Sequence, residues 1–339
     1  MKNKVSINDI AKQLNISKTT VSFILNGRAR EKRISDSVVK KVQDLVEELD
    51  YKPNPLAQGL RTGKSNTIGL MVEDISNPFF ANIARLIEDM AYQNGYKILY
   101  CSTDNKTDKT RELIKVFQER HVDGYIIAPP ENVEDDINAL LKNGFPVVMF
   151  DRYLPEVNTD HVVVDNFQST YQATRHLIEQ GFKNIGFITF ISSQTQMQGR
   201  LVGYKEALKE ADLKPQVKEI QFDRNENLII DALTTYLKRN QGFDAILFGT
   251  NHIGACGLKV MSSLGIKIPE DIAVVSFDDY DVFQLSSPPV TAVAQPFEEI
   301  ANNIISLLLK KLANRTNTSI QKVSLSTNLI VRKSSISTK

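Results

Sequence analysis

Apolar residues near the N-terminus recur at the spacing of a helix with one buried face, at Ile7, Ile10, Ala11 and Leu14. Positions i, i+3, i+4 and i+7 lie on one side of an α-helix, so this pattern predicts a first helix. Ser6 and Asp9 stand at the two positions of a capping box, in which each side chain satisfies a free backbone N–H. We therefore expect the helix to begin just after Ser6.

A second helix is expected after a short break at Asn15 and Ile16, because Ser17 is a good N-cap. It should run to about Asn26 or Gly27. The residues that point inward from it are Val21, Ile24 and Leu25. The opposite stripe is polar apart from one ring and consists of Lys18, Thr19, Ser22, Phe23 and Asn26. A third helix is expected to start at Ser35 and to bury Val38, Val42, Leu45, Val46 and Leu49.

From residue 67 onward, short apolar runs alternate with amphipathic helical patterns. The runs predicted as strands are 67–72, 97–101, 124–128, 147–150, 162–164, 185–189, 217–221, 245–248, 272–277 and 291–294. Several helices between them end in a glycine suited to a left-handed C′ position, at Gly95, Gly144, Gly181 and Gly265. This alternation predicts parallel, doubly wound sheets. The strands are too numerous for one comfortable sheet, so we expect two similar α/β lobes.

Charge divides the chain in the same way as the hydrophobic pattern does. Residues 1–63 hold 12 Lys and Arg against 7 Asp and Glu, a net charge of +5, whereas the whole chain carries +1, which leaves −4 for the rest. A basic head on an acidic body indicates nucleic acid as the partner of the head.

Several classes of protein are disfavoured by motifs that the sequence lacks. The N-terminus shows no apolar signal-peptide region and no apolar run approaches the roughly 18 residues that span a membrane, so we expect a cytoplasmic protein. Cys101 and Cys256 are interpreted as small buried hydrophobes rather than a disulfide, and the four histidines show no metal-ligand spacing. No Gly-rich phosphate loop follows the first strand and no Gly-x-Ser-x-Gly elbow occurs, so we expect neither an enzyme nor a cofactor. A transport-linked sugar-binding protein would suit the body alone, but the basic head argues against it.

Two short helices joined by a tight turn and followed by a third are the layout of a helix-turn-helix. The second helix would present Lys18 and Thr19, near its N-terminus, to base edges in the major groove. A plain three-helix bundle with one polar face fits the same spacing. Phe23 either packs on a thymine methyl group or is a partly buried ring at the helix edge. The cationic loop from Arg28 to Arg33 favours phosphate contact over a merely solvated surface.

Three segments give the chain a specific resemblance to a known family. They are Ser6-Ile-Asn-Asp-Ile-Ala-Lys12 with Ile16-Ser-Lys-Thr-Thr-Val-Ser22, Tyr51-Lys-Pro-Asn-Pro-Leu-Ala57 with Leu60-Arg-Thr-Gly-Lys-Ser65, and Thr67-Ile-Gly-Leu-Met-Val72 with Asp74-Ile-Ser-Asn-Pro-Phe-Phe80. From Val5 to Arg332 the chain resembles the LacI/GalR family of bacterial transcription regulators. The resemblance implies an α/β two-lobed effector domain like the type I periplasmic binding proteins, with a small all-α helix-turn-helix domain at its N-terminus.

The resemblance also implies a DNA-binding surface on the head and a hinge. Its residues in this chain are Ser6, Ser17, Lys18, Thr19, Ser22, Phe23, Asn26, Arg28, Arg30, Arg33, Asn54, Ala57 and Leu60. The hinge would be helical only when held in the minor groove, with Leu60 as an apolar wedge between base steps. We expect Leu60→Ala to weaken operator affinity tens-fold or more. The domains are therefore expected at 1–50 (helix-turn-helix), 51–64 (hinge) and 65–339 (ligand binding and dimerisation).

The chain departs from the family pattern at three places. Phe23 stands where the family usually has an arginine, and the loop at 28–33 is about three residues longer than usual. In the effector pocket, His252 replaces a common aspartate beside Asn251.

Ligands of parallel α/β sheets bind at the carboxyl ends of the strands. The strand ends and the family pattern together predict an effector site of Asp74, Phe79, Phe80, Asp151, Arg200, Asn251 and Asp278. Arg200 matches the pocket arginine of the family, and an arginine facing a carboxylate suits the adjacent hydroxyls of a polyhydroxy ligand. Plainer interpretations remain: a helix cap for Asp278, core packing for Phe80 and a surface cation for Arg200.

We therefore expect a cytoplasmic, homodimeric regulator, a repressor rather than an activator, that binds a palindromic operator in double-stranded DNA. A small molecule, expected to be a sugar or sugar derivative, would control operator affinity from between the two lobes. Asp278→Ala is expected to abolish effector-induced release from DNA without unfolding the protein.

Overall fold

A computed structural model describes residues 5–51, 64–239, 242–314 and 319–337 of the chain. The chain divides into two compact units, residues 1–65 and residues 66–339. No helix among the described residues is both long enough and apolar enough to cross a membrane.

The N-terminal unit is built from three helices, α1 (Ile7–Gln13), α2 (Lys18–Leu25) and α3 (Asp36–Glu48). Their shared core consists of Ile10, Ala11, Val21, Ile24, Val42 and Leu45. At the start of α1, the backbone N–H of Ser6 donates to the Asp9 carboxylate at 2.9 Å, which confirms the predicted capping box. The Ser17 hydroxyl accepts from the Thr20 amide at 3.0 Å and begins α2 in the same manner. The second helix ends slightly earlier than predicted, at Leu25.

The C-terminal unit contains two six-stranded sheets of matching strand order. The first sheet runs β2-β1-β3-β4-β5-β11 and contains β1 (Thr67–Val72), β2 (Lys97–Ser102), β3 (Gly124–Ile127), β4 (Val147–Phe150), β5 (Asp160–Val164) and β11 (Lys322–Leu325). The second runs β7-β6-β8-β9-β10-β12 and contains β6 (Ile185–Phe190), β7 (Gln216–Ile220), β8 (Ala245–Phe248), β9 (Ala273–Phe277), β10 (Thr291–Ala294) and β12 (Asn328–Ile330). Neighbouring strands are parallel except β10 and β12, which are antiparallel. The expectation of two similar α/β lobes is therefore confirmed.

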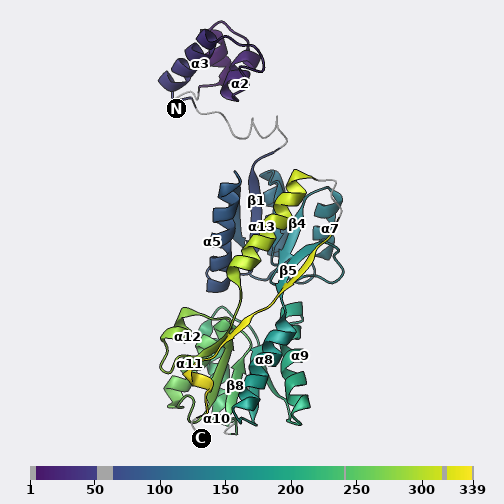
Figure 1. Ribbon diagram of the computed structural model, residues 1–339, viewed down its shortest axis with the longest axis vertical. Coiled ribbons are helices and arrows are strands. Elements are labelled where there is room, and N and C mark those ends of the chain that lie inside the picture. Colours follow the sequence, from purple (N-terminus) through teal and green to yellow (C-terminus); the bar gives the residue numbers. More distant parts are fainter. Residues whose placement is uncertain (1–4, 52–63, 240–241, 315–318, 338–339) are drawn as a thin grey trace. The chain divides into compact units, whose positions relative to one another are not determined.

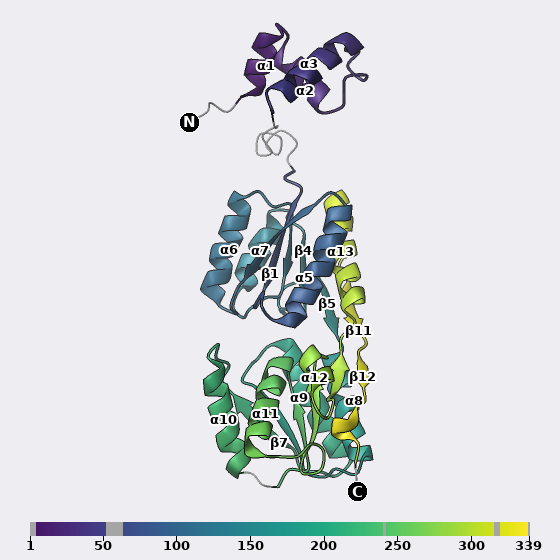
Figure 2. The same ribbon diagram turned by 90° about the vertical axis from the view of Figure 1, so that its left-hand side faces the viewer.

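Helices cover both faces of each sheet (Figures 1 and 2). On the first sheet, α5 (Pro78–Gln93) and α13 (Phe297–Ala313) pack on one face, and α6 (Thr107–Glu119) and α7 (Glu134–Lys142) on the other. On the second sheet, α8 (Asn166–Glu179) and α9 (Thr195–Glu210) pack on one face, and α10 (Glu226–Arg239) and α11 (Asn251–Leu264) on the other. The short helices α12 (Asp281–Leu285) and η1 (Lys333–Ser335) complete the second lobe.

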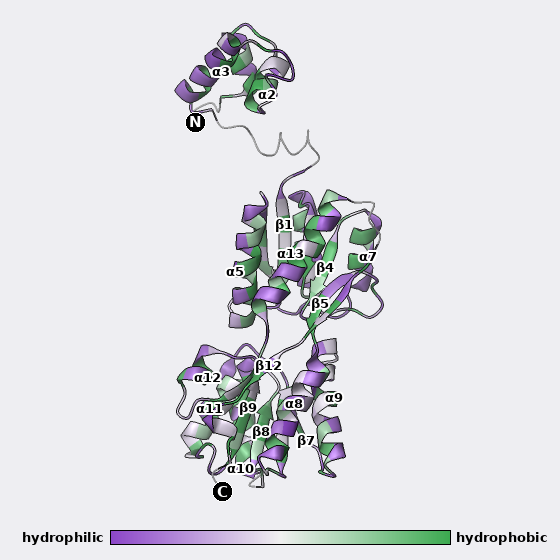
Figure 3. Ribbon diagram, viewed as in Figure 1, coloured by the Kyte–Doolittle hydropathy of each residue, from purple (hydrophilic) through white to green (hydrophobic). Residues whose placement is uncertain are grey.

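Burial on both faces explains why the central strands read as unbroken apolar runs. Strands β3, β4 and β8 are buried at every position. In Figure 3 the central strands of both sheets are mostly hydrophobic in colour, whereas the helices carry hydrophilic residues on their outer sides.

The chain passes between the two lobes three times. After β5 it enters the second lobe at α8, and after β10 it returns through Gln295 and Pro296 to α13 of the first lobe. Between β11 and β12 it crosses once more through Ser326 and Thr327, so these two strands form one long ribbon that joins the sheets (yellow in Figure 1). Three crossings make a natural hinge between the lobes, because each is only a few residues long.

Strands β11 and β12 were not predicted from the sequence, and this is the main error in the secondary structure. They are short edge strands whose residues are alternately exposed and half-buried, so they contain no apolar run. The ten predicted strands are all present in the structure, and their observed ends differ from the predicted ends by at most two residues.

Candidate functional site

The polar stripe of α2 forms one exposed side of the N-terminal unit. Lys18 and Thr19 are exposed in the first turn, and Ser22, Phe23 and Asn26 are half-buried further along. Ser6 and Ser17 hold the starts of α1 and α2. The remaining predicted residues of this surface, Asn54, Ala57 and Leu60, lie outside the described residues.

The loop after α2 folds back over the Phe23 ring. The guanidinium carbon of Arg28 lies 5.7 Å and the Lys32 ammonium 5.4 Å from the centre of that ring, both within cation–π range. Arg28 also donates two hydrogen bonds to Glu31, at 2.7 and 2.6 Å. This pairing, helped by Lys32, lowers the pKa of Glu31 to about 2. Phe23 is therefore a half-buried ring beneath two cations.

Arg28 differs from Arg30 and Arg33, the two other arginines of this loop, in having its charge paired with Glu31. Arg30 and Arg33 are exposed, and Arg33 has a left-handed backbone conformation with φ +52°. The charge of Arg28 is already balanced within the loop, and sequence reasoning missed the role of Glu31 in balancing it.

In the C-terminal unit, a cavity of about 720 Å³ lies between the two lobes. The structure brings all seven residues of the predicted effector site to its wall: Asp74, Phe79, Phe80, Asp151, Arg200, Asn251 and Asp278. Asp74, Asp151, Asn251 and Asp278 come from the carboxyl ends of strands in both sheets, as the rule for parallel sheets expects, whereas Phe79 and Phe80 begin α5 and Arg200 lies within α9.

Asp151 and Asp278 occupy equivalent places in the two lobes. Asp151 directly follows β4 and Asp278 directly follows β9, and these strands hold the same position in their sheets. Both residues have left-handed backbones, with φ of +65° and +67°. Such a conformation is costly for a residue other than glycine and clusters at functional sites.

Asp278 is nearly buried and is held by the crossing segment between the lobes. Gln295, which follows β10 at the second crossing, donates a hydrogen bond from Nε2 to Asp278 Oδ1 at 2.5 Å. Sequence reasoning did not select Gln295, because its contact with Asp278 joins the ends of two neighbouring strands, β9 and β10, and carries no local signal.

Arg200 is a cavity side chain with only 3% of its surface exposed. It donates from Nε to Asn166 Oδ1 and from Nη1 to the Gly249 carbonyl, each at 2.8 Å. Both partners are neutral, and burial lowers the pKa of Arg200, although Asp278 and Asp151 oppose this shift. The surface-cation interpretation is therefore wrong, because the guanidinium is buried.

Arg152, the neighbour of Asp151, ties together three loops of the first lobe. It donates to Asp151 Oδ2 at 3.0 Å, to Asn105 Oδ1 at 3.1 Å and to Glu73 Oε2 at 2.7 Å. Burial raises the pKa of Asp151, and Arg152 and Arg200 counteract that rise. The Arg152 guanidinium is thus occupied by three side chains of the first lobe. Of these two buried arginines, Arg200 therefore has more hydrogen-bond donors left for a ligand.

The apolar part of the wall begins at the start of α5. Asn77 caps this helix by accepting from the Phe79 amide at 3.0 Å, and Pro78 suits the first helical position. Phe79 and Phe80 consequently reach the cavity in the first turn, edge to face with ring centres 4.9 Å apart. Both rings also belong to the hydrophobic core. Phe80 therefore packs in the core and lines the cavity at the same time, so the two interpretations of this residue are compatible.

Two buried polar atoms of wall residues, Gln196 Oε1 and His252 Nε2, lack a hydrogen-bond partner among the described residues. The Oε1 atom of Gln196, on α9, is buried and accepts no hydrogen bond from any residue that the structure describes. Gln196 lines the cavity, so a hydroxyl donor of a ligand there would satisfy it.

Side chains from the two lobes also meet at the cavity and beside it. Arg224 of the second lobe pairs with Asp104 of the first, and Ser193 hydrogen-bonds to Glu131. Gln194 donates to Asn105 at 2.9 Å and Asn251 donates to Asn77 at 3.3 Å. These contacts depend on how closely the lobes approach each other, so opening the lobes would break them.

Comparison with known proteins places this architecture in a family. A model described as "Bacterial regulatory proteins, lacI family" matches residues 6–54, and one described as "Periplasmic binding protein-like domain" matches residues 174–335. The transcriptional regulator DegA of Bacillus subtilis is 31% identical over 342 residues, which cover 98% of each chain. The chain belongs to the LacI family of bacterial regulatory proteins. The predicted family and fold class are therefore confirmed, and a LacI-family protein is a DNA-binding transcriptional regulator rather than an enzyme.

Two solved structures extend the comparison of this LacI-family chain. A LacI-family regulator from Enterococcus faecium with bound ribose is 26% identical, with a TM-score of 0.71 over 79% of this chain and 98% of that one. The lac repressor dimer bound to operator and an anti-inducer is 20% identical, with a TM-score of 0.85 over 99% and 100% of the two chains. At that identity the second comparison shows the fold alone.

Proposed function

We propose that this LacI-family regulator is a homodimeric repressor whose operator affinity is controlled by a sugar or sugar derivative bound between the two lobes. One observation carries the proposal: carboxylates, an unpaired amide oxygen and a buried guanidinium converge on a single interlobe cavity. The protein would act in the cytoplasm, where its DNA is.

The wall chemistry supports a neutral polyhydroxy ligand. Asp151, Asp278 and Gln196 offer acceptors for hydroxyl groups, and Arg200 offers donors that lack a charged hydrogen-bond partner. The paired rings of Phe79 and Phe80 offer an apolar face to the carbon side of a sugar ring. A volume of about 720 Å³ lies within the usual range of roughly 300–1,000 Å³ for small-molecule sites. The bound ribose of the Enterococcus faecium relative agrees with this ligand class.

Control of DNA binding would follow from the position of the ligand between the lobes. A ligand changes the balance of two lobe arrangements only by its differential affinity for them. The ion pair of Arg224 and Asp104 joins the two lobes, and Arg224 is 61% exposed, so the pair contributes at most about 1 kcal/mol to closure. A ligand that grips Asp151 of one lobe and Asp278 of the other can therefore outweigh it.

On the DNA side, the exposed start of α2 would enter the major groove, with Lys18 and Thr19 at base edges. Phosphate contacts would come from the basic loop, chiefly Arg30 and Arg33. The other proposed contact residues are Ser6, Ser17, Ser22, Phe23, Asn26 and Arg28, together with the hinge residues Asn54, Ala57 and Leu60. A homodimer would place two such heads on one palindromic site, because each protomer supplies one head.

The test measures DNA and effector binding on the same full-length protein. Fluorescence anisotropy with DNA from upstream of the gene should give saturable binding that a palindromic half-site mutation weakens and that falls steeply with salt. Thermal-shift screening of sugars and sugar phosphates should identify a ligand that releases this DNA from wild type but not from Asp278→Asn. Equal binding to unrelated DNA, or a releasing ligand that acts equally on Asp278→Asn, would overturn the proposal.

A further inference from the structure

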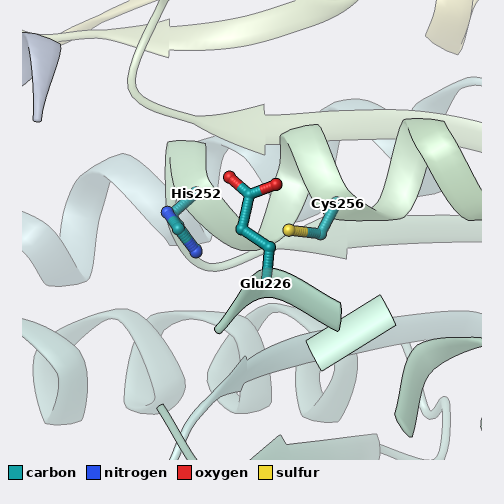
Figure 4. A group of neighbouring side chains, drawn as sticks. All are labelled: Glu226, His252 and Cys256. Atoms are coloured by element: carbon teal, nitrogen blue, oxygen red, sulfur yellow. The ribbon is translucent and has the colours of Figure 1, made fainter. Parts of the chain in front are cut away.

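Three side chains capable of binding a metal ion meet on the second lobe, where α10 packs against α11 (Figure 4). His252 and Cys256 lie one turn apart on α11, and Glu226 is the first residue of α10. Their ligand atoms all lie within 4.8 Å of one another. In Figure 4 the carboxylate of Glu226 reaches up between the imidazole ring and the sulfur atom.

We propose that Glu226, His252 and Cys256 bind a divalent zinc-class metal ion in the wall of the effector cavity. One nitrogen, one sulfur and one oxygen ligand suit zinc and its neighbours rather than magnesium or calcium, which prefer oxygen alone. Two residues at i and i+4 of one helix point the same way, so a single rigid element supplies two ligands.

The distances require only a small adjustment. Bonds of about 2.0–2.3 Å to a tetrahedral zinc separate its ligand atoms by roughly 3.5 Å. Ligand atoms already within 4.8 Å reach that separation by side-chain movements of about 1 Å. Glu226 is free to move because it is exposed, whereas Cys256 is buried and fixed by the core.

The state of the three side chains also favours a cation. His252 Nε2 is buried and accepts no hydrogen bond from the described residues, although the rings of Phe190 and Phe222 lie about 6 Å away as apolar neighbours. A thiolate and a carboxylate would give the site two negative charges, which balance a divalent ion in this half-buried place.

Lys259 competes for one of these ligands without blocking the site. Its ammonium lies 2.6 Å from Glu226 Oε2, and the two side chains are 57% and 46% exposed. An exposed pair of this kind contributes little stability and leaves Oε1 available for the metal.

The site lies at the effector cavity without being part of the proposed sugar contacts. His252 and Glu226 line the cavity wall, whereas Cys256 lies behind it. Three protein ligands leave a fourth coordination position, which would face the cavity and could take water or an oxygen atom of a ligand. A bound ion would also join the start of α10 to α11. The inference goes beyond the proposed function, and its test needs neither DNA nor sugar.

The first experiment titrates Co²⁺ into tag-free, reduced, metal-stripped full-length protein. We expect one ion per chain and a thiolate-to-cobalt charge-transfer absorption that Zn²⁺ then removes. Cys256→Ser should lose this absorption, and Cys101→Ser should keep it, since these are the two cysteines of the chain. No thiolate absorption in the wild type, or equal absorption in both variants, would overturn the proposal.

A second variant avoids the buried cysteine, whose replacement alone could loosen the core. Glu226 is exposed, so its replacement should not disturb the core. In Glu226→Gln the amide oxygen can still accept a hydrogen bond from Lys259, but the negative charge of the metal ligand is lost. We expect its Zn²⁺ affinity, measured by competition with a chromophoric chelator, to fall at least tenfold. Glu219→Gln, an exposed change on β7, is the matched control and should keep the wild-type affinity. Equal affinities of the two variants would also overturn the proposal.

Discussion

The guanidinium carbon of Arg200 lies 3.5 Å from the centre of the Phe277 ring, so the two planes are in contact. Phe277 ends β9 and directly precedes Asp278, which means that one strand end supplies both the stacking surface and the neighbouring carboxylate. The guanidinium is thus fixed on one face by a ring and along its edges by Asn166 and Gly249. This fixation prepares its remaining donors for a ligand before the ligand arrives.

Replacing Arg200 by lysine should therefore cost much more than its retained charge suggests. An ammonium group cannot stack on Phe277 while bonding both Asn166 and Gly249. We expect effector affinity, measured by calorimetry, to fall about a hundredfold, within the roughly 2–5 kcal/mol that truncating a buried hydrogen-bonded charge costs. The exposed Arg224→Lys is the control and should change affinity less than about fivefold, since a rim pair contributes at most ~1 kcal/mol. Comparable losses in the two variants would contradict this account of the cavity.

The packing of α8 against α9 depends on a glycine. A Cβ atom at Gly203 would overlap the carbonyl oxygen of Phe167 and lie 3.0 Å from the Tyr171 amide, both backbone atoms that cannot move aside alone. We expect Gly203→Ala to destabilise the larger unit by about 1–3 kcal/mol, measured by calorimetric unfolding. Val202→Ala, on an exposed position of the same helix, should stay within about 0.5 kcal/mol of wild type. Equal stability of both variants would show that the helices are not closely packed there.

The sequence predicted what depends on local periodicity and strand ends. Apolar runs located ten strands, and the rule for parallel sheets led from the ends of β4 and β9 to Asp151 and Asp278. The rule works because the strand order, once parallel, brings all carboxyl ends to one edge.

Contacts between distant segments could not be predicted in this way. Gln295 holds Asp278 from the end of the neighbouring strand, and Glu31 neutralises Arg28 through a turn whose shape no periodicity encodes. His252 and Cys256 are four residues apart in the sequence, a spacing that places two ligands on one face of a helix. Finding this pair would have required a search for a histidine and a cysteine on one predicted helix, and not for spacing among the histidines. Glu226 comes from another helix, so its approach required the fold.

Arginines of the basic loop should contribute unequally to the salt dependence of DNA binding. Each phosphate contact adds about 0.9 to the slope of the logarithm of the binding constant against that of salt concentration. Arg30→Ala and Arg33→Ala should each lower the slope by about 0.9, because both side chains are exposed. Arg28→Ala should lower it less, because Glu31 already balances that charge. Anisotropy titrations at several salt concentrations provide the slopes, and three equal reductions would show that Arg28 exchanges Glu31 for phosphate.

Acid should destabilise the larger unit partly through His176. Its Nε2 lies 2.7 Å from the Ser335 hydroxyl, and burial lowers the pKa of His176, although Glu179 counteracts the shift. The unfolded chain takes up a proton near pH 6.5, whereas the folded His176 resists it, so protonation favours unfolding. The stability from this residue is therefore complete above about pH 6.5 and is lost progressively as the pH falls from that value through the lower pKa of the folded state.

His176→Gln tests this linkage because glutamine does not titrate but can still hydrogen-bond to Ser335. We expect its melting temperature to fall less than that of the wild type between pH 7.5 and 5.5, with both measured by differential scanning calorimetry. Part of the fall should remain, because burial also lowers the pKa of His161. A comparison at pH 8, where the imidazole of the wild type is neutral in both states, separates the lost hydrogen bond from the lost titration. If the melting temperatures of the variant and the wild type fall by the same amount between pH 7.5 and 5.5, His176 is excluded as a source of the acid sensitivity.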